Sequence, residues 1–246
     1  SPRVRNGAVY FGSENGTVYA LSAKDGKTRW TYQAGGAVKG GVAYANGKLF
    51  FGDYSGQVNA IDANSGKLRW RSGGGGALGI GDGQFYGTAS VAFGRVYIGN
   101  TNSSVYSFST KDGALAWRVS TGGYVYSSAA VADVPKLGPT VFIGSYDGRL
   151  YALDAKSGAV RWSRAAGGRI SGGIQIIGDL VFYSTLEKKT AALSLRSGRT
   201  IWSVRKGQFN PAISDGKLLF LNSITALFAY ETTTNGKLNS VPSKGR

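Results

Sequence analysis

The sequence predicts an all-β fold made of about six tandem four-stranded units. Three observations support this: a repeat near 40 residues, short apolar alternations that end in turns, and 39 glycines in 246 residues. Period-two alternation bounded by Gly, Asn, Asp and Ser is typical of short strands joined by hairpins. A period near 40 with four strands per unit is the pattern of a β-propeller, in which each unit forms one blade.

Five tryptophans mark the repeat. They are spaced 40, 47, 45 and 40 residues apart, and each lies four residues after a glycine. On the outermost strand of a blade, each ring would pack into the next blade and bury about 150–250 Å². A stacking platform for carbohydrate or bases is the alternative, but regular spacing favours the structural role. The pairs are Gly26 and Trp30, Gly66 and Trp70, Gly113 and Trp117, Gly158 and Trp162, and Gly198 and Trp202.

The second unit shows the strands most clearly. They are expected at 41–45, 48–52, 57–63 and 67–72, separated by Asn-Gly and Ser-Gly pairs that suit tight hairpin turns. Extra residues in a glycine-rich run at 73–83 and at 134–139 explain the longer spacings. The six repeats of this single domain span approximately 1–34, 38–72, 85–121, 126–166, 171–206 and 208–241.

The last unit is degenerate. It keeps its glycine, Gly236, but has Ser240 where the tryptophan is expected, which suggests a terminal blade. Six units would permit a closed six-bladed ring. The alternative is that further units precede Ser1 in a longer chain.

Composition excludes several chemistries. The chain has no cysteine and no histidine, which excludes disulfides, thiolate nucleophiles, Cys/His zinc sites and histidine bases. We expect no metal and no cofactor. No apolar run approaches the about 18 residues of a transmembrane helix, so none is expected.

The charge is strongly basic, with 29 Lys and Arg against 13 Asp and Glu, a formal net charge of +16. Such a field favours acidic partners. Many of these residues fall in the third hairpin turn or on the outermost strand of a unit, where basic side chains protect sheet edges. A solvated rim is therefore the first interpretation, and a dedicated polyanion site stays open. Nucleic acid is not an expected partner.

The mouth of the central channel is the predicted binding site, because loops from every blade converge there. Alignment of the units on their first hairpin turn places one set of residues just before the innermost strands, and the second hairpin loops add two tyrosines. Tyrosines with a few basic and amide groups are typical of protein interfaces; ordinary turn residues are the alternative. The candidates are Lys39, Tyr86, Tyr126 and Gln208, their neighbours Tyr124, Arg169 and Phe209, and the loop residues Tyr54 and Tyr146.

The pattern A-x-D/S-x-x-x-G-x-x-x-W, as in ALSAKDGKTRW at 20–30 and ALDAKSGAVRW at 152–162, resembles the repeats of pyrroloquinoline-quinone dehydrogenase propellers and their cofactor-free relatives. Those relatives include the propeller lipoprotein of the outer-membrane β-barrel assembly machinery and extracytoplasmic domains of bacterial sensor kinases. The resemblance covers essentially the whole chain and implies an extracytoplasmic location: periplasmic, cell-surface or secreted.

The cofactor-free branch implies a non-enzymatic binding or scaffolding role, with another protein or an acidic surface polymer as partner. The quinone-dependent enzymes of this family use a vicinal disulfide and a calcium cluster of carboxylate and amide groups. This chain has no cysteine, and its carboxylates are scattered over different turns. A quinoprotein activity is therefore the least favoured of the three readings.

Overall fold

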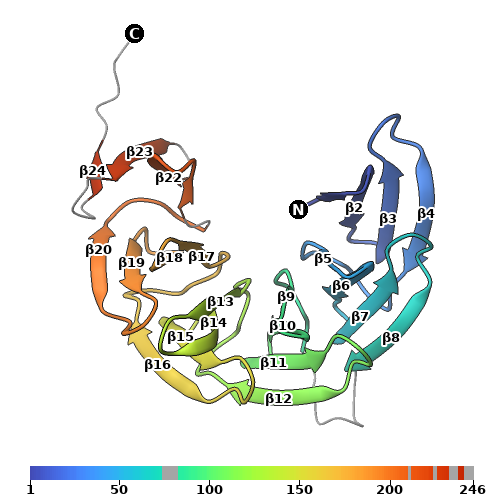
Figure 1. Cartoon of the computed structure of the whole chain (residues 1–246), viewed down its shortest axis with the longest axis horizontal. Helices are drawn as coiled ribbons and strands as arrows, with labels where there is room; N and C mark the ends of the chain where they lie inside the picture. The colour runs from blue at the N-terminus through green and yellow to red at the C-terminus, as the bar shows by residue number, and fades with distance from the viewer. Residues whose placement is uncertain (74–82, 210–211, 224–225, 233–237, 241–246) are drawn as a thin grey trace.

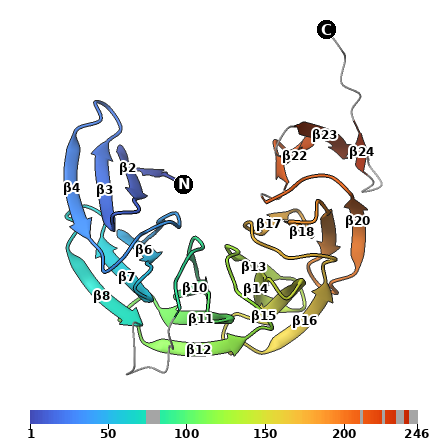
Figure 2. The same ribbon diagram turned by 180° about the vertical axis from the view of Figure 1, so that it is seen from behind.

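The computed structural model describes residues 1–73, 83–209, 212–223, 226–232 and 238–240, and these residues form strands and turns without a helix. The strands make six four-stranded antiparallel sheets, each built from four consecutive strands. The sheets are arranged as propeller blades in an open arc, with the first and sixth sheets at its two ends (Figures 1 and 2). The all-β prediction and the count of six units are confirmed.

The first three sheets are β1 (Arg3–Arg5), β2 (Ala8–Gly12), β3 (Thr17–Ser22) and β4 (Thr28–Gln33); β5 (Ala43–Ala45), β6 (Lys48–Gly52), β7 (Gln57–Asp62) and β8 (Leu68–Gly73); and β9 (Ser90–Ala92), β10 (Arg95–Asn100), β11 (Ser104–Ser109) and β12 (Leu115–Ser120). The last three are β13 (Ala130–Val134), β14 (Gly138–Gly144), β15 (Arg149–Asp154) and β16 (Val160–Ala165); β17 (Gln175–Ile177), β18 (Leu180–Ser184), β19 (Thr190–Ser194) and β20 (Thr200–Val204); and β21 (Ile213–Ser214), β22 (Leu218–Asn222), β23 (Leu227–Thr232) and β24 (Leu238–Ser240).

The first strand of a sheet faces the centre that the six sheets surround, and the fourth strand lies on the outer rim, as β5 and β8 show (Figure 1). The strands predicted for the second unit agree with β5 to β8 within about two residues at each end. Most of the glycine-rich run (74–82) and Gly236 lie outside the described residues.

The tryptophans join neighbouring sheets. Trp117 Nε1 donates a hydrogen bond of 3.1 Å to the carbonyl of Ala155 in the next sheet, and Trp162 Nε1 does the same to Leu195. Trp30 and Trp70 make equivalent bonds to Ala63 and Thr110. The fifth, Trp202, packs edge-on against Tyr230 of β23 with ring centroids 5.3 Å apart.

Four glycines of the repeat receive the tryptophan of the preceding sheet: Gly66, Gly113, Gly158 and Gly198. A Cβ atom on Gly158 would lie 2.8 Å from the Trp117 ring, and one on Gly113 would lie 2.6 Å from the Trp70 ring. Both glycines also have positive φ, 79° and 76°, which a residue with a side chain rarely adopts. The glycine therefore forms the turn and also leaves room for the neighbouring indole.

A β-bulge precedes each tryptophan. In the fourth sheet Ala152 pairs with Trp162 but Leu153 pairs with Val160, so Arg161 is the extra residue of its strand. The same shift occurs at Arg29 and Arg69. Because a bulge bends the strand and redirects its side chains, simple alternation does not fix where these arginines point.

Candidate binding surface

Backbone hydrogen bonds fix the loops that carry the candidate residues. The segment between the third and fourth sheets accepts a bond at the Tyr124 carbonyl from Tyr146 N, 2.9 Å, and donates one from Val125 N to Asn100, 3.2 Å. It is therefore bonded to the sheets on both sides. Equivalent pairs of bonds recur at 37–38, 84–85 and 169–170. This repetition places Lys39, Tyr86 and Tyr126 at matching points, as the alignment of the units predicts.

Four tyrosines form a continuous line across these loops. The ring centroids of Tyr54 and Tyr86 are 6.1 Å apart, those of Tyr86 and Tyr126 5.1 Å, and those of Tyr126 and Tyr146 4.8 Å. All three distances lie within the range of about 4.5–7 Å that is usual for interacting aromatic pairs. Tyr124 branches from the line, 5.9 Å from Tyr126. We refer to these five residues as the tyrosine arc.

A cation lies at each end of the tyrosine arc. Lys39 Nζ is 5.2 Å from the ring centroid of Tyr54, and the Arg169 guanidinium carbon is 5.8 Å from that of Tyr146. Both distances permit a cation–π interaction. The arrangement therefore runs from a lysine through the tyrosines to an arginine.

Each terminal cation is also paired with a glutamate. Lys39 Nζ is 3.2 Å from Glu14 Oε1, and Arg169 Nε is 3.1 Å from Glu187 Oε1. Glu187 also accepts a bond of 2.8 Å from the Arg169 amide. Both glutamates lie in second hairpin loops, the type of loop that contributes Tyr54 and Tyr146.

Much of the tyrosine arc is available for contact. Tyr86 is 42% exposed and Tyr124 is 52% exposed, while Tyr54, Tyr126 and Tyr146 are half-buried. Burial raises the pKa of the Tyr54 and Tyr126 hydroxyls. The hydrogen bond to Glu14 raises the pKa of Lys39. At neutral pH the Tyr54 and Tyr126 hydroxyls are therefore uncharged, and Lys39 keeps its positive charge.

Two aspartates, Asp53 and the half-buried Asp147, hold the loops that carry Tyr54 and Tyr146. The Asp53 carboxylate, fully buried, accepts bonds from the amides of Ser55 and Gln57 and from the Asn59 side chain. Asp147 accepts bonds from the Gly122 amide and the Tyr151 hydroxyl. These contacts give the tyrosines fixed positions before any partner binds.

Two predicted residues lie apart from the tyrosine arc. Gln208 donates through its side chain to the carbonyl of Leu186, 2.9 Å, next to a hollow between the fifth and sixth sheets. Phe209 is 46% exposed and has a positive φ of 62°. The structure thus brings together seven of the nine candidates.

The rim charges are not all free. Arg161 Nη2 lies 2.6 Å from Asp154 and its side chain is only 14% exposed, whereas Arg69 pairs with Asp62 at 2.7 Å and stays 53% exposed. The interpretation of these arginines as a solvated rim is therefore incomplete, because two of them clamp the third hairpin turn of their own sheet.

The described residues hold no group of three or more acidic side chains placed to bind a metal ion. Nor does any helix with the length and apolarity to span a bilayer occur among them.

Sequence and structure comparisons identify the class of protein. The family model described as outer membrane protein assembly factor BamB, which belongs to the PQQ-like repeats, matches residues 1–38 and 14–238. The chain therefore belongs to this PQQ-like, BamB-type propeller family. No curated protein sequence matches the chain.

Solved structures share the fold at low sequence identity. BamB from Moraxella catarrhalis superposes with a TM-score of 0.79 at 20% identity, over 98% of this chain and 70% of that one. The computationally designed Ika8 protein gives 0.81 at 14% identity, over 97% and 72%. Quinohemoprotein alcohol dehydrogenase from Comamonas testosteroni gives 0.73 at 15%, over 94% of this chain and 52% of that one. At 14–20% sequence identity, these similarities show a shared fold alone.

Proposed function

We propose that this chain is a non-enzymatic scaffolding propeller that binds another protein through the tyrosine arc and its two terminal cations, Lys39 and Arg169. The observation that carries the proposal is the unbroken line of partly exposed rings, from Lys39 over Tyr54 at 5.2 Å to Arg169 over Tyr146 at 5.8 Å. Tyrosine and arginine are enriched among the residues that dominate protein-binding energies.

The physical character of the surface supports a protein partner. Tyrosine offers a large apolar ring and a hydroxyl with few rotatable bonds, so it makes contacts at a low cost in conformational entropy. Here the rings also restrain one another, and the buried carboxylate of Asp53 holds the loop that carries Tyr54. A surface ordered in advance loses less freedom on binding.

The family supports the same function. Its model is described as an outer membrane protein assembly factor, a role in which a protein acts by contacting other proteins. We extend this role, and the extracytoplasmic location that goes with it, to this chain. The hydrogen bonds of the tryptophans to the next sheet support their assignment as the tryptophan-docking motifs of the family.

Two other functions have weaker support. A quinoprotein-like activity rests on the likeness to the dehydrogenase, which at 15% identity bears on the fold. Polyanion binding by a diffuse basic rim is weakened by the pairing of Arg69 and Arg161 with aspartates.

The test is a quantitative pull-down with Tyr86→Ala/Tyr126→Ala as the variant. Removal of two central rings should lower recovery of a specific protein partner at least tenfold at moderate salt, because the middle of the tyrosine arc is lost. Tyr44→Ala is the matched control, since Tyr44 is a half-buried tyrosine on the inner strand β5, outside the arc. Equal recovery with the double variant and the wild type would refute the proposal.

A further inference from the structure

Two adjoining hollows beside the fifth sheet share Arg205. The first has a volume of about 480 Å³ and is lined by Gly167, Glu187, Lys189, Ser203, Val204 and Arg205. The second, of about 290 Å³, has Lys188, Arg205, Lys206, Gln208 and Phe228 among its lining residues. We call the two together the basic cleft. The first hollow has the size of a small-molecule site, about 300–1,000 Å³, and the second lies at the lower end of that range.

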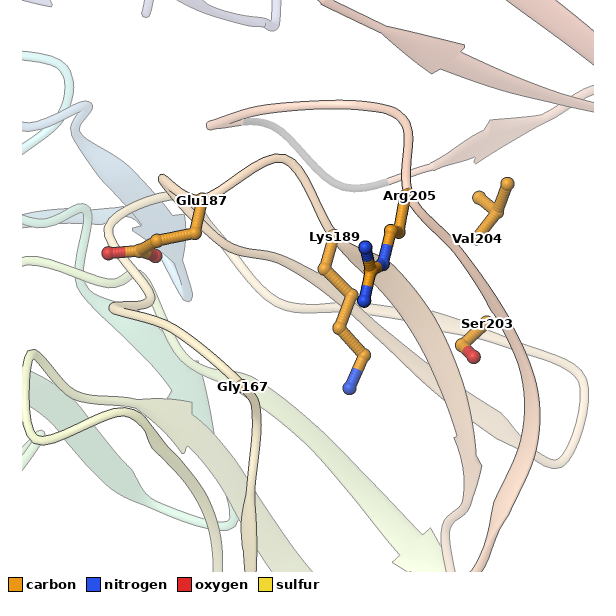
Figure 3. Close-up of a pocket in the computed structure, with 6 residues that line it drawn as sticks. All are labelled: Gly167, Glu187, Lys189, Ser203, Val204 and Arg205. Carbon is orange, nitrogen blue, oxygen red and sulfur yellow. The ribbon is translucent and has the colours of Figure 1, made fainter.

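Four cations surround the basic cleft: Lys188, Lys189, Arg205 and Lys206. Its one carboxylate belongs to Glu187, which is already bonded to Arg169 through both its oxygens. Figure 3 shows the Lys189 and Arg205 side chains extending toward the same space, while the Glu187 carboxylate points away from them. Within the described ranges no ion pair involves any of the four cations.

Hydrogen bonds fix the backbone at Lys189 and Lys206. The Lys189 amide donates to the Thr185 hydroxyl, 3.2 Å, and the Lys206 carbonyl accepts from the Thr190 hydroxyl, 2.7 Å. One basic segment is therefore bonded to the residue after β18, and the other to the first residue of β19. Lys206 Nζ lies 4.6 Å from the Phe228 ring centroid, so the sixth sheet holds it as well.

A glycine leaves room for one of the amines. A Cβ atom on Gly167 would lie 3.2 Å from Lys189 Nζ, so the lysine extends over bare backbone at this point. Gly167 also has a positive φ of 81°, which disfavours any other residue. The half-buried Lys189 amine is thus kept beside the hollow rather than free in solvent.

Like charges gathered around a hollow concentrate anions there, and multivalent anions most strongly. Guanidinium and ammonium groups together are the usual protein ligands of phosphate. We propose that the basic cleft binds a phosphorylated ligand that carries at least two anionic groups. Glu187 lies next to both this site and Arg169, but the residues varied in the two tests differ, so either proposal can fail without the other.

The experiment is calorimetric titration of the whole chain with inorganic tripolyphosphate at physiological salt. We expect saturable binding at one site, and orthophosphate should bind at least tenfold more weakly. Lys189→Ala/Arg205→Ala should lower the tripolyphosphate affinity at least tenfold. Lys67→Ala/Lys156→Ala removes the same charge from two exposed turn lysines and should change the affinity by less than twofold.

Equal losses in the two double variants would overturn the proposal, because they would show attraction by overall charge. Absence of saturable binding to the wild type would overturn it too. Should the cleft variant unfold, Lys189→Met, which keeps the aliphatic chain, gives the same comparison.

The phosphates could belong to a soluble molecule or to a lipid headgroup. Sedimentation with vesicles that contain a diphosphorylated lipid separates the two. Vesicle binding lost only in the cleft variant supports the site with a lipid as ligand. Tripolyphosphate binding without vesicle binding supports it with a soluble ligand.

Discussion

Sheets 1 and 2 have the same strand pattern, but their corresponding faces differ in burial. In sheet 2, Leu49, Phe51 and Ile61 are fully buried against apolar side chains of sheet 1. Their counterparts in sheet 1, on the face turned away from sheet 2 at one end of the arc (Figure 1), are only half-buried. They are Val9, Phe11 and Leu21.

The repeat glycine shows the same difference. A Cβ atom on Gly66 would lie 2.7 Å from the Trp30 ring, whereas one on Gly26 would meet nothing within 4 Å. The two glycines have nearly equal φ angles, 69° and 71°. The repeat glycine therefore forms a turn in both sheets, but only in sheet 2 does it also leave room for a tryptophan of the preceding sheet. A neighbouring sheet, rather than the unit itself, gives the motif most of its stabilising effect.

The largest expected effect is the difference between Phe51→Ala and Phe11→Ala in the free energy of unfolding that each substitution costs. Phe51 is fully buried between two sheets, so its loss should cost about 3–5 kcal/mol of the free energy of unfolding. Phe11, half-buried and stacked on Tyr19 at 5.2 Å, should cost about 1 kcal/mol. Urea denaturation of both variants measures the difference. Equal costs would mean that the face of sheet 1 that carries Phe11 is covered in solution, and that the two sheets do not differ in burial.

The next effect separates Gly158→Ala from Gly26→Ala. Both substitutions place a side chain at positive φ, which costs about 1–2 kcal/mol. At Gly158 the methyl group also meets the Trp117 ring at 2.8 Å and Val119 at 2.9 Å, and such overpacking adds about 1–3 kcal/mol. Thermal unfolding should show the larger loss for Gly158→Ala. If Gly26→Ala is equally destabilising, the contact with Trp117 adds nothing to the cost of the substitution at Gly158.

Local signals predicted the strands well, but contacts between sheets were harder to predict. The run 48–52 matches β6 because period-two alternation and the flanking Asn-Gly and Ser-Gly turns are properties of adjacent residues. That Gly66 accommodates Trp30 could not be predicted, since the spacing only shows one glycine and one tryptophan per unit. The bulge at Arg161 was also missed, because alternation assumes an unbroken register.

The candidate surface was predictable where backbone bonding repeats. Lys39, Tyr86 and Tyr126 follow equivalent bonded pairs in successive connections, so alignment of the units located them. Gln208 and Phe209 lie outside the line because side-chain direction in a loop depends on its own turn geometry. The basic cleft was missed for a related reason: its cations come from two loops that only the fold brings together, although the doublets Lys188-Lys189 and Arg205-Lys206 were visible in the sequence.

The smallest expected effect concerns the charged clamp of sheet 2, which sheet 1 lacks because Ser22 replaces the aspartate. The hydrogen bond from Arg69, with further bonds from the Ser65 and Asn64 segment, lowers the pKa of Asp62 from 3.8 to about 2. A lowered folded-state pKa stabilises the protein above pH 3.8, and this contribution is lost as the pH falls toward about 2. Because the Arg69 side chain is 53% exposed, Asp62→Asn should cost only about 0.5–1 kcal/mol at neutral pH.

Unfolding free energies at pH 6 and pH 3 should therefore differ less in Asp62→Asn than in the wild type. Ser22→Ala is the control that should leave the pH dependence unchanged. An unchanged pH dependence in Asp62→Asn would show that the clamp adds nothing to the stability of sheet 2.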